Sequence, residues 1–256
     1  MNWKTFTAML RRDAHVARRN FIPLILQTML QPLLFVFIFG QVMIRSGYMP
    51  QGYKAMLLPG IMAISMLMTG IQAVSMPLIA EFQFTREIED RLLAPMKIQW
   101  LAIEKVVAGM IQSLVSGLIV VVAGWLVMGT DVGVSFGNPA LFVAILFLVA
   151  LLSAAGGLTL GCSVGQTQIG LLFSLVLAPM IMFGCAYYPW SALKSFRVLQ
   201  IAVLVNPLVY ASEGLRGVLA PNIPHINTMI VLAVLVVADA ALILFGLNRF
   251  FRKAVQ

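Results

Sequence analysis

Residues 81–97 read EFQFTREIEDRLLAPMK, and they separate two long apolar stretches of the chain. Four of the 9 acidic residues in the protein fall within this segment, at Glu81, Glu87, Glu89 and Asp90. Such a density of charge must lie in water, whereas each flanking stretch is long enough to cross a bilayer as a helix. The segment therefore marks a loop at a membrane surface between two spanning helices.

The composition extends this interpretation to the whole chain, which has 256 residues, of which 61% are hydrophobic and 10% are charged. Soluble domains carry ~25% charged residues, so most of this chain must have lipid as its solvent. The sequence lacks the short alternating strands of a membrane β-barrel. We predict an all-α polytopic membrane protein that forms a single transmembrane domain over residues 1–256.

Apolar runs of roughly 20 residues predict transmembrane helices. We expect six, over residues 21–44, 55–80, 100–128, 139–162, 168–187 and 226–247. Residues 1–20 place Trp3, Phe6 and Leu10 on one helical face and several arginines on the rest. This pattern is typical of a helix that lies in the membrane interface.

Residues 188–225 do not fit a seventh span. An apolar run is interrupted there by Asn206-Pro207, and Glu213 and Arg216 follow. Irregular backbone at membrane depth is tolerated where protein or water covers it, so we predict a re-entrant hairpin. Because Glu213 and Arg216 are three residues apart, they can share a helical face. They could form a local ion pair or a gate at the external mouth.

Basic residues set the predicted orientation. Most of them lie in residues 1–20, near residues 81–97 and at the C-terminus, which six spans place on one side. Fewer lie on the other side, namely Arg45, Lys54, Lys194, Arg197 and Arg216. The positive-inside rule therefore places both termini and residues 81–97 in the cytoplasm. It also accounts for the net charge of +8, which we do not attribute to nucleic-acid binding.

The sequence offers no catalytic site. It contains no Gly-Lys dipeptide, which a phosphate-binding Walker loop requires, and it has only two histidines, His15 and His225. No cluster of histidine, cysteine or acidic residues has the spacing of a metal site. We therefore expect that the chain is not an enzyme and binds no cofactor or metal. If ATP and Mg²⁺ are used, a partner chain must bind them.

Two features within the spans favour packing roles. Ser153, Gly157, Gly161 and Gly165 recur every four residues and let another helix approach closely. We expect that approach to occur within the subunit rather than at a dimer seam. Cys162 and Cys185 lie in apolar stretches, and we interpret them as unpaired packing residues.

Asp239 is an acid near the middle of the last predicted span. Intramembrane acids are costly and often functional. Asp239 is a possible intramembrane polar site, with two interpretations. It could form a hydrogen bond with a Ser, Thr or Gln of another helix, or it could carry protons in a secondary transporter.

Within residues 81–97, Phe84, Ile88 and Leu92 are spaced by four and form an apolar ridge, which Pro95 ends. Such a short amphipathic helix can dock into a groove of a partner protein. The alternative is a solvated loop with incidental spacing. Four charged residues of the same segment face elsewhere, namely Arg86, Glu87, Glu89 and Asp90. Arg91 belongs to the same candidate docking segment.

Several motifs, taken in order along nearly the whole chain, resemble those of a known family. They are Arg86-Glu87, Leu92-Leu93-Ala94-Pro95, Glu104-Lys105, Phe183-Gly184-Cys185-Ala186-Tyr187-Tyr188-Pro189, Asn206-Pro207-Leu208-Val209-Tyr210 and Glu213-Gly214-Leu215-Arg216. The sequence resembles the permease subunits of type-2 (ABC-2) ABC exporters. One departure is Glu89-Asp90, where many relatives have Gly-Thr.

This resemblance implies a function for each segment. Residues 81–97 would be the coupling helix that contacts the ATPase, and the hairpin of residues 188–225 would lie at the external face. The permease would work as a pair, for which we expect a homodimer, with two separate ATPase chains that bind ATP and Mg²⁺. The resemblance also implies a bacterial-type cytoplasmic membrane and export of an amphiphilic, lipid-linked, polysaccharide or drug-like cargo.

Two alternatives remain open from the sequence. One is a proton-coupled secondary transporter that uses Asp239, and the other is a membrane scaffold that transports nothing. Co-purification of an ATPase distinguishes the exporter from both.

Overall fold

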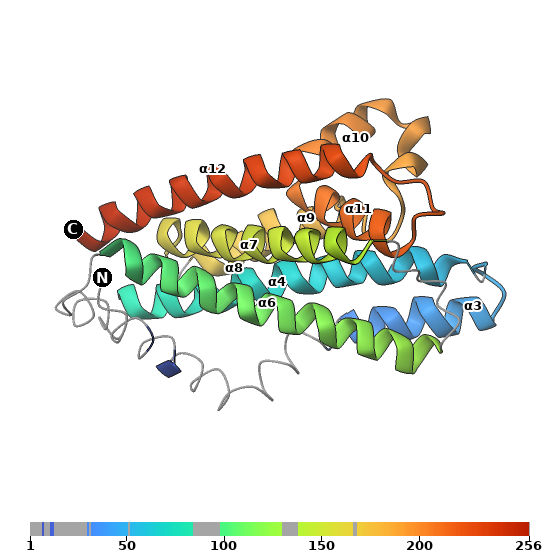
Figure 1. The fold of residues 1–256 in the computed structure, drawn as a ribbon, viewed down its shortest axis with the longest axis horizontal. Helices are drawn as coiled ribbons and strands as arrows, with labels where there is room; N and C mark the ends of the chain where they lie inside the picture. The colour runs from blue at the N-terminus through green and yellow to red at the C-terminus, as the bar shows by residue number, and fades with distance from the viewer. Residues whose placement is uncertain are drawn as a thin grey trace.

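The computed structural model describes Thr7, Arg11, Arg12, Leu30 and residues 32–50, 52–83, 98–129, 138–165 and 168–255. Within these ranges every regular element is a helix, so the all-α prediction is confirmed (Figure 1). Most of the predicted interfacial helix, and residues 84–97 of the predicted coupling helix, lie outside the described residues.

Four long helices form the body of the protein. They are α4 (Tyr53–Gln83), α6 (Ile98–Met128), α7 (Pro139–Ser163) and α12 (Thr228–Val255). Each contains an apolar segment long enough to cross a membrane, because the ~30 Å hydrocarbon core requires about 20 helical residues. They run along the long axis of the molecule (Figure 1), and α7 contacts the other three. The protein is therefore a multi-pass membrane protein.

The first and fifth predicted spans are described only as shorter helices. An apolar helix runs from Pro32 to Arg45 and includes the π-helical turn η1 (Ile38–Val42) and α3 (Met43–Arg45). At 1.5 Å per residue, the described part of this helix is shorter than the bilayer core. Among the described residues, four helices are long enough to span, or five if one bent pair counts as a span. The six-span arrangement stays a prediction.

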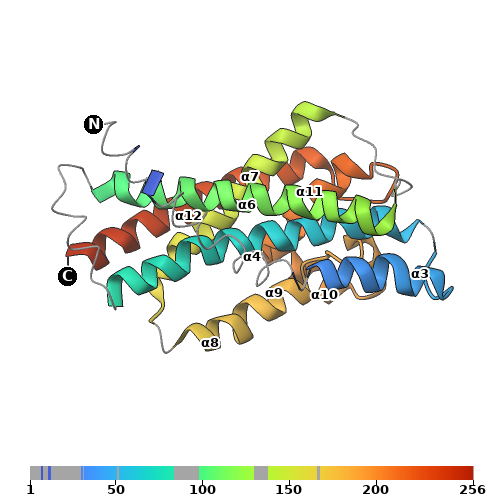
Figure 2. The same cartoon turned by 90° about the horizontal axis from the view of Figure 1, so that it is seen from below.

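The fifth predicted span is divided among three short elements. They are α8 (Ile169–Leu172), η3 (Phe173–Leu177) and α9 (Ala178–Met182). The helix ends before Phe183, whereas we predicted helix to residue 187. Figure 2 shows α8 at the edge of the molecule, apart from the four long helices.

The segment predicted as a hairpin is broken at Asn206. Before it come η4 (Trp190–Ser195), α10 (Arg197–Ala202) and η5 (Val203–Val205), and after it α11 (Pro207–Leu219). The helices on the two sides of the break differ in direction by 97°. Asn206 has extended backbone, and its side-chain oxygen accepts a hydrogen bond from the Leu208 N–H at 3.0 Å. Pro207 occupies the first helical position, where its missing N–H costs nothing.

The predicted small-residue stripe packs against α4. A Cβ added at Gly157 would lie 2.7 Å from the carbonyl oxygen of Ile71, and one added at Gly161 would lie 3.0 Å from the Cα of Ser75. Real Cβ atoms essentially never approach backbone as closely as at Gly157, and the contact at Gly161 is tighter than most Cβ atoms make, so the absence of side chains permits this close packing. The prediction that these glycines pack within the subunit is confirmed.

A buried network of hydroxyl groups joins α4, α6 and α7 beside this stripe. The Ser116 hydroxyl lies 2.9 Å from the hydroxyls of both Ser65 and Thr69. The Ser153 hydroxyl donates to that of Ser113 at 3.1 Å, and the Ser113 hydroxyl to a backbone carbonyl of α4 at 2.9 Å. All five side chains are buried. Each is satisfied by hydrogen bonds between helices, as polar groups in a bilayer must be.

Candidate functional site

One end of the helix bundle is held by a buried ion pair. Lys105, near the start of α6, donates a hydrogen bond from Nζ to Oε1 of Glu81, near the end of α4, at 2.7 Å. Their side chains are 4% and 8% exposed. The pair therefore ties together the two helices that lead into and out of residues 84–97.

The C-terminal helix joins the same end. The ring of Phe82 makes an edge contact with the ring of Phe250 of α12, with centroids 5.8 Å apart. The Lys253 ammonium lies 4.8 Å from the centroid of the Phe82 ring, within the range of a cation–π interaction. Lys253 also donates to the carbonyl oxygen of Gly161 on α7 at 3.4 Å. We call Glu81, Phe82, Lys105, Phe250 and Lys253 the ionic base.

The residues predicted to couple to an ATPase follow directly from this base along the chain. Phe84, Arg86, Glu87, Ile88, Glu89, Asp90, Arg91 and Leu92 lie outside the described residues. Their coupling role stays a prediction. What the structure adds is the way in which both flanks of this segment are anchored.

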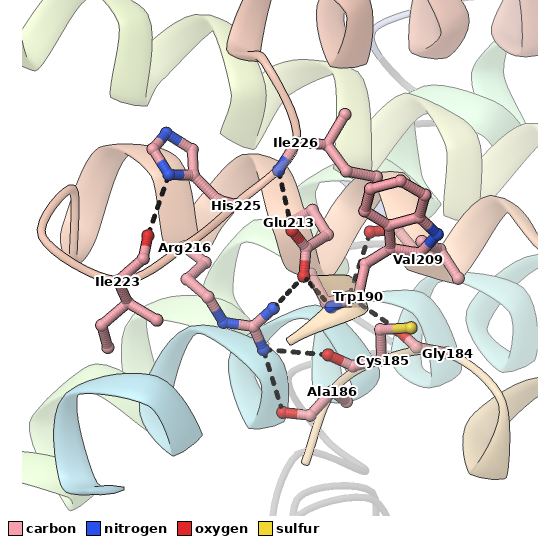
Figure 3. Close-up of polar contacts among 11 residues, drawn as sticks. Gly184, Cys185, Ala186, Trp190, Val209, Glu213, Arg216, Ile223, His225 and Ile226 are labelled. Atoms are coloured by element: carbon pink, nitrogen blue, oxygen red, sulfur yellow. Dashed lines mark hydrogen bonds and ion pairs between the residues drawn. The ribbon is translucent and has the colours of Figure 1, made fainter. Parts of the chain in front are cut away.

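At the other end, Glu213 and Arg216 form an ion pair on α11 (Figure 3). Both side chains are 0% exposed. Oε1 of Glu213 accepts hydrogen bonds from Nη1 of Arg216 and from the backbone N–H of Trp190, the latter at 2.9 Å. Oε2 accepts from the backbone N–H of Ile226 at 2.9 Å. The single carboxylate thus holds the start of η4 and the loop that leads into α12.

Arg216 holds a third segment. Its Nη2 donates to the carbonyl oxygens of Cys185 at 2.9 Å and Ala186 at 3.4 Å (Figure 3). Cys185 has a φ of +52°, a left-handed conformation that is uncommon for a residue other than glycine. The Ser212 hydroxyl secures the preceding carbonyl, that of Gly184, at 2.6 Å.

We call this group of contacts the hairpin clamp. It consists of Glu213, Arg216 and their backbone partners at Cys185, Ala186, Trp190 and Ile226. The local ion pair that the sequence predicted is present, and it is fully buried. Its possible role as an external gate stays a prediction.

Asp239 lies on the face of α12 that packs against its neighbours, and it is 3% exposed. On the same helix, Val231 contacts α11 and Gly246 contacts α7. Neither carboxylate oxygen of Asp239 has a hydrogen-bond partner among the residues that the structure describes. The expected hydrogen bond to a Ser, Thr or Gln is thus not made by any of them. The sequence of α7, against which α12 packs, contains no charged residue.

The remaining candidate groups are inert in the described parts of the chain. Cys162 and Cys185 are both buried and unpaired, as predicted. No three His, Cys, Asp or Glu residues come together there as a metal site would require.

The family described as ABC-2 type transporter matches residues 4–220 of the chain. The chain belongs to the ABC-2 type transporter family. The match covers the ionic-base residues of α4 and α6 and both charged residues of the hairpin clamp, whereas α12 with Asp239 lies beyond it. A comparison with curated proteins finds no match. The ABC-2 transporter is thus a membrane permease of ABC-type transport, a component distinct from the ATPase with which such permeases act.

Proposed function

We propose that this ABC-2 permease exports an amphiphilic, lipid-linked, polysaccharide or drug-like molecule from the cytoplasm. Two copies of a separate ATPase bind ATP and Mg²⁺ and drive the transport, and a second copy of the permease completes the translocation pathway. The observation that carries this proposal is the ionic base, which anchors both flanks of residues 84–97 in the membrane domain.

The ionic base is suited to transmitting a movement of residues 84–97 to the membrane helices. A partner that moves residues 84–97 acts on the end of α4 and the start of α6 together, because Glu81 and Lys105 join them. Removing one member of a buried ion pair costs about 3–5 kcal/mol, so the two ends do not separate easily. The contacts of Phe82 with Phe250 and Lys253 extend the movement to α12.

The same arrangement supports the proposed orientation in a bacterial-type cytoplasmic membrane. The base and the C-terminus lie at one end of the long helices, and α3 and the loop before α12 lie at the other (Figure 1). Both termini and the base then face the cytoplasm, where basic residues concentrate. The hairpin clamp faces the exterior.

A proton-coupled carrier is less well supported. Asp239 is a single acid, and α7 beside it contains no acidic or basic side chain in its sequence. A proton relay uses chains of such groups. We therefore place Asp239 outside the proposed transport mechanism.

The proposal is tested by purifying the tagged permease from its native membrane and measuring the ATPase that accompanies it. Ile88→Ala and Leu92→Ala each remove an apolar anchor from the proposed docking ridge. Truncation of such an anchor costs ~2 kcal/mol or more, which corresponds to roughly 30-fold weaker association. Both variants should lose ATPase and transport while inserting normally into the membrane.

Glu87→Ala is the matched control, because this residue lies off the ridge and should matter less unless it pairs with a partner cation. If both ridge variants retain the ATPase and transport at wild-type levels, residues 81–97 are a solvated loop. If no ATPase accompanies the wild-type permease, the exporter assignment itself fails.

A further inference from the structure

A cavity of about 390 Å³ lies at the end of the bundle opposite the ionic base. It is lined by η1 and α3, the start of α4 and the end of α6, including Gln41, Arg45, Lys54 and Met128. Its volume falls within the range of small-ligand sites. The lining contains two basic residues and no acidic residue.

The two basic groups come from different helices and have no acidic partner within the described part of the chain. Arg45 ends α3 and is exposed. Lys54 lies in the first turn of α4, which contains no acidic residue. The positive end of the α4 helix dipole therefore adds to the charge of both side chains.

The negative end of α6 does not cancel this charge. Lys54 Nζ donates to the carbonyl oxygen of Met128 at 2.9 Å, and Gln41 Nε2 donates to that of Val127. These two bonds satisfy carbonyl groups that the end of a helix leaves open. An ammonium has three N–H donors and a guanidinium has five. Among the residues that the structure describes, most donors of Lys54 and all side-chain donors of Arg45 are left for a ligand.

We propose that this cavity binds a phosphate-bearing anion at the membrane surface. The planar fork of an arginine matches the oxygens of a phosphate, and Lys54 supplies a second positive charge from the facing helix. The cavity lies where α4 begins and α6 ends, at the membrane-surface end of two helices that are long enough to span. The phosphate can belong to the headgroup of an anionic lipid or to a soluble molecule. In the orientation proposed above, the cavity faces the outer leaflet, and only this placement rests on the proposed function.

The test measures lipid retention by the purified full-length permease in the absence of any ATPase. Native mass spectrometry counts bound lipids after incubation with an equal mixture of phosphatidylglycerol and phosphatidylcholine with the same acyl chains. Wild-type permease should retain phosphatidylglycerol in preference. Arg45→Gln should lower that retention about tenfold, because charge-assisted hydrogen bonds are lost.

Arg45→Gln is the primary variant because Arg45 has no hydrogen bond to a described residue that its loss would break. Lys54→Gln should act in the same direction, although it also removes the bond to Met128. Arg197→Gln is the matched control, since Arg197 is an exposed arginine outside this cavity. Asp131→Asn removes a negative charge that is close in sequence to the cavity-lining residue Gly129, so retention of phosphatidylglycerol should be unchanged or higher. Asp131 itself lies outside the described residues.

Inorganic phosphate, added as a competitor, distinguishes the two sources of the ligand. Displacement of phosphatidylglycerol by phosphate shows that the phosphate group alone is recognised, so that soluble phosphate compounds can also bind. Retention in excess phosphate, together with loss in Arg45→Gln, assigns the site to a lipid headgroup.

The proposal is overturned if wild-type permease shows no preference for phosphatidylglycerol, or if Arg45→Gln and Lys54→Gln both retain it fully. It is also overturned if Arg197→Gln causes the same loss, because retention would then depend on the overall surface charge and not on the cavity. A lower retention in Asp131→Asn would contradict it as well. A negative result concerns the cavity alone, because ATPase co-purification is measured separately.

Discussion

Truncation of Glu213 should be among the most destabilising single changes in the hairpin clamp. Glu213→Ala leaves the Arg216 guanidinium buried without its counter-ion, a loss that costs about 3–5 kcal/mol. It also removes the acceptor of the Trp190 and Ile226 N–H groups, each worth about 1–3 kcal/mol when left unsatisfied. These contributions are not additive, so we expect the free energy of unfolding to fall by at least about 4 kcal/mol.

The contacts also predict an order among the variants. Arg216→Ala should be less harmful than Glu213→Ala, because the carboxylate keeps its two backbone donors. Arg197→Ala, at an exposed position of α10, should be nearly neutral and serves as the matched control. The double variant Glu213→Gln with Arg216→Met should recover part of the loss, since it leaves no unpaired buried charge.

The assay is thermal unfolding of the detergent-purified permease, followed by size-exclusion chromatography of the surviving protein. For a domain of about 150–250 residues, 1 kcal/mol shifts Tm by roughly 2–4 °C. Glu213→Ala should therefore lower Tm by about 8–16 °C. Equal melting temperatures for Glu213→Ala and Arg197→Ala would refute the clamp. Unchanged stability with altered transport would instead favour the gate hypothesis.

Three further changes test the packing and the orientation. Gly157→Val places a side chain within 2.7 Å of an α4 carbonyl and should lower the free energy of unfolding by about 1–3 kcal/mol or more. Gly156→Val is its control. The nearest neighbouring atom there is 3.7 Å away, so this variant should lower Tm less in the same melting assay. Asp239→Asn should preserve folding and ATP-driven transport, and loss of transport with normal ATPase association would revive the proton-carrier alternative. Single cysteines at Glu89 and Lys194, in a background without native cysteines, should react with an impermeant reagent in intact cells only at position 194, and the opposite pattern would reverse the topology.

The sequence predicted the elements whose cause is local. Apolar runs predicted the positions of the four long helices, because a bilayer demands length and hydropathy together. Their bounds agree to within a few residues except at the end of α12, which continues beyond the predicted residue 247 to Val255. The break at Asn206-Pro207 was also predictable, since proline cannot continue a helix. The end of α9 at Met182 was not predicted, because the following residues remain apolar although they leave the helix.

Contacts between residues of different helices could not be predicted from the sequence in the same way. Glu81 and Lys105 lie 24 positions apart, and nothing in their spacing shows that α4 and α6 bring them together. The partners of Glu213, apart from Arg216, are backbone groups of distant segments, which leave no mark in sequence. The serines and threonine of the hydroxyl network are individually ordinary. Only the packing of α4, α6 and α7 against one another brings them together.

The helix α4 connects the two charged assemblies at opposite ends of the protein. Near one end it carries Glu81 of the ionic base. At the other, the Tyr53 hydroxyl donates to the Tyr187 carbonyl at 3.0 Å, directly beside the carbonyls that Arg216 holds. A Cβ at Gly60 would lie 1.9 Å from the carbonyl oxygen of Ala186, so the clamped backbone rests on α4 itself. Because interiors this tightly packed shift as units rather than deform smoothly, we propose that α4 carries a displacement of the base to the hairpin clamp. The contact itself requires the absence of a side chain at Gly60, since a Cβ there would overlap the Ala186 carbonyl.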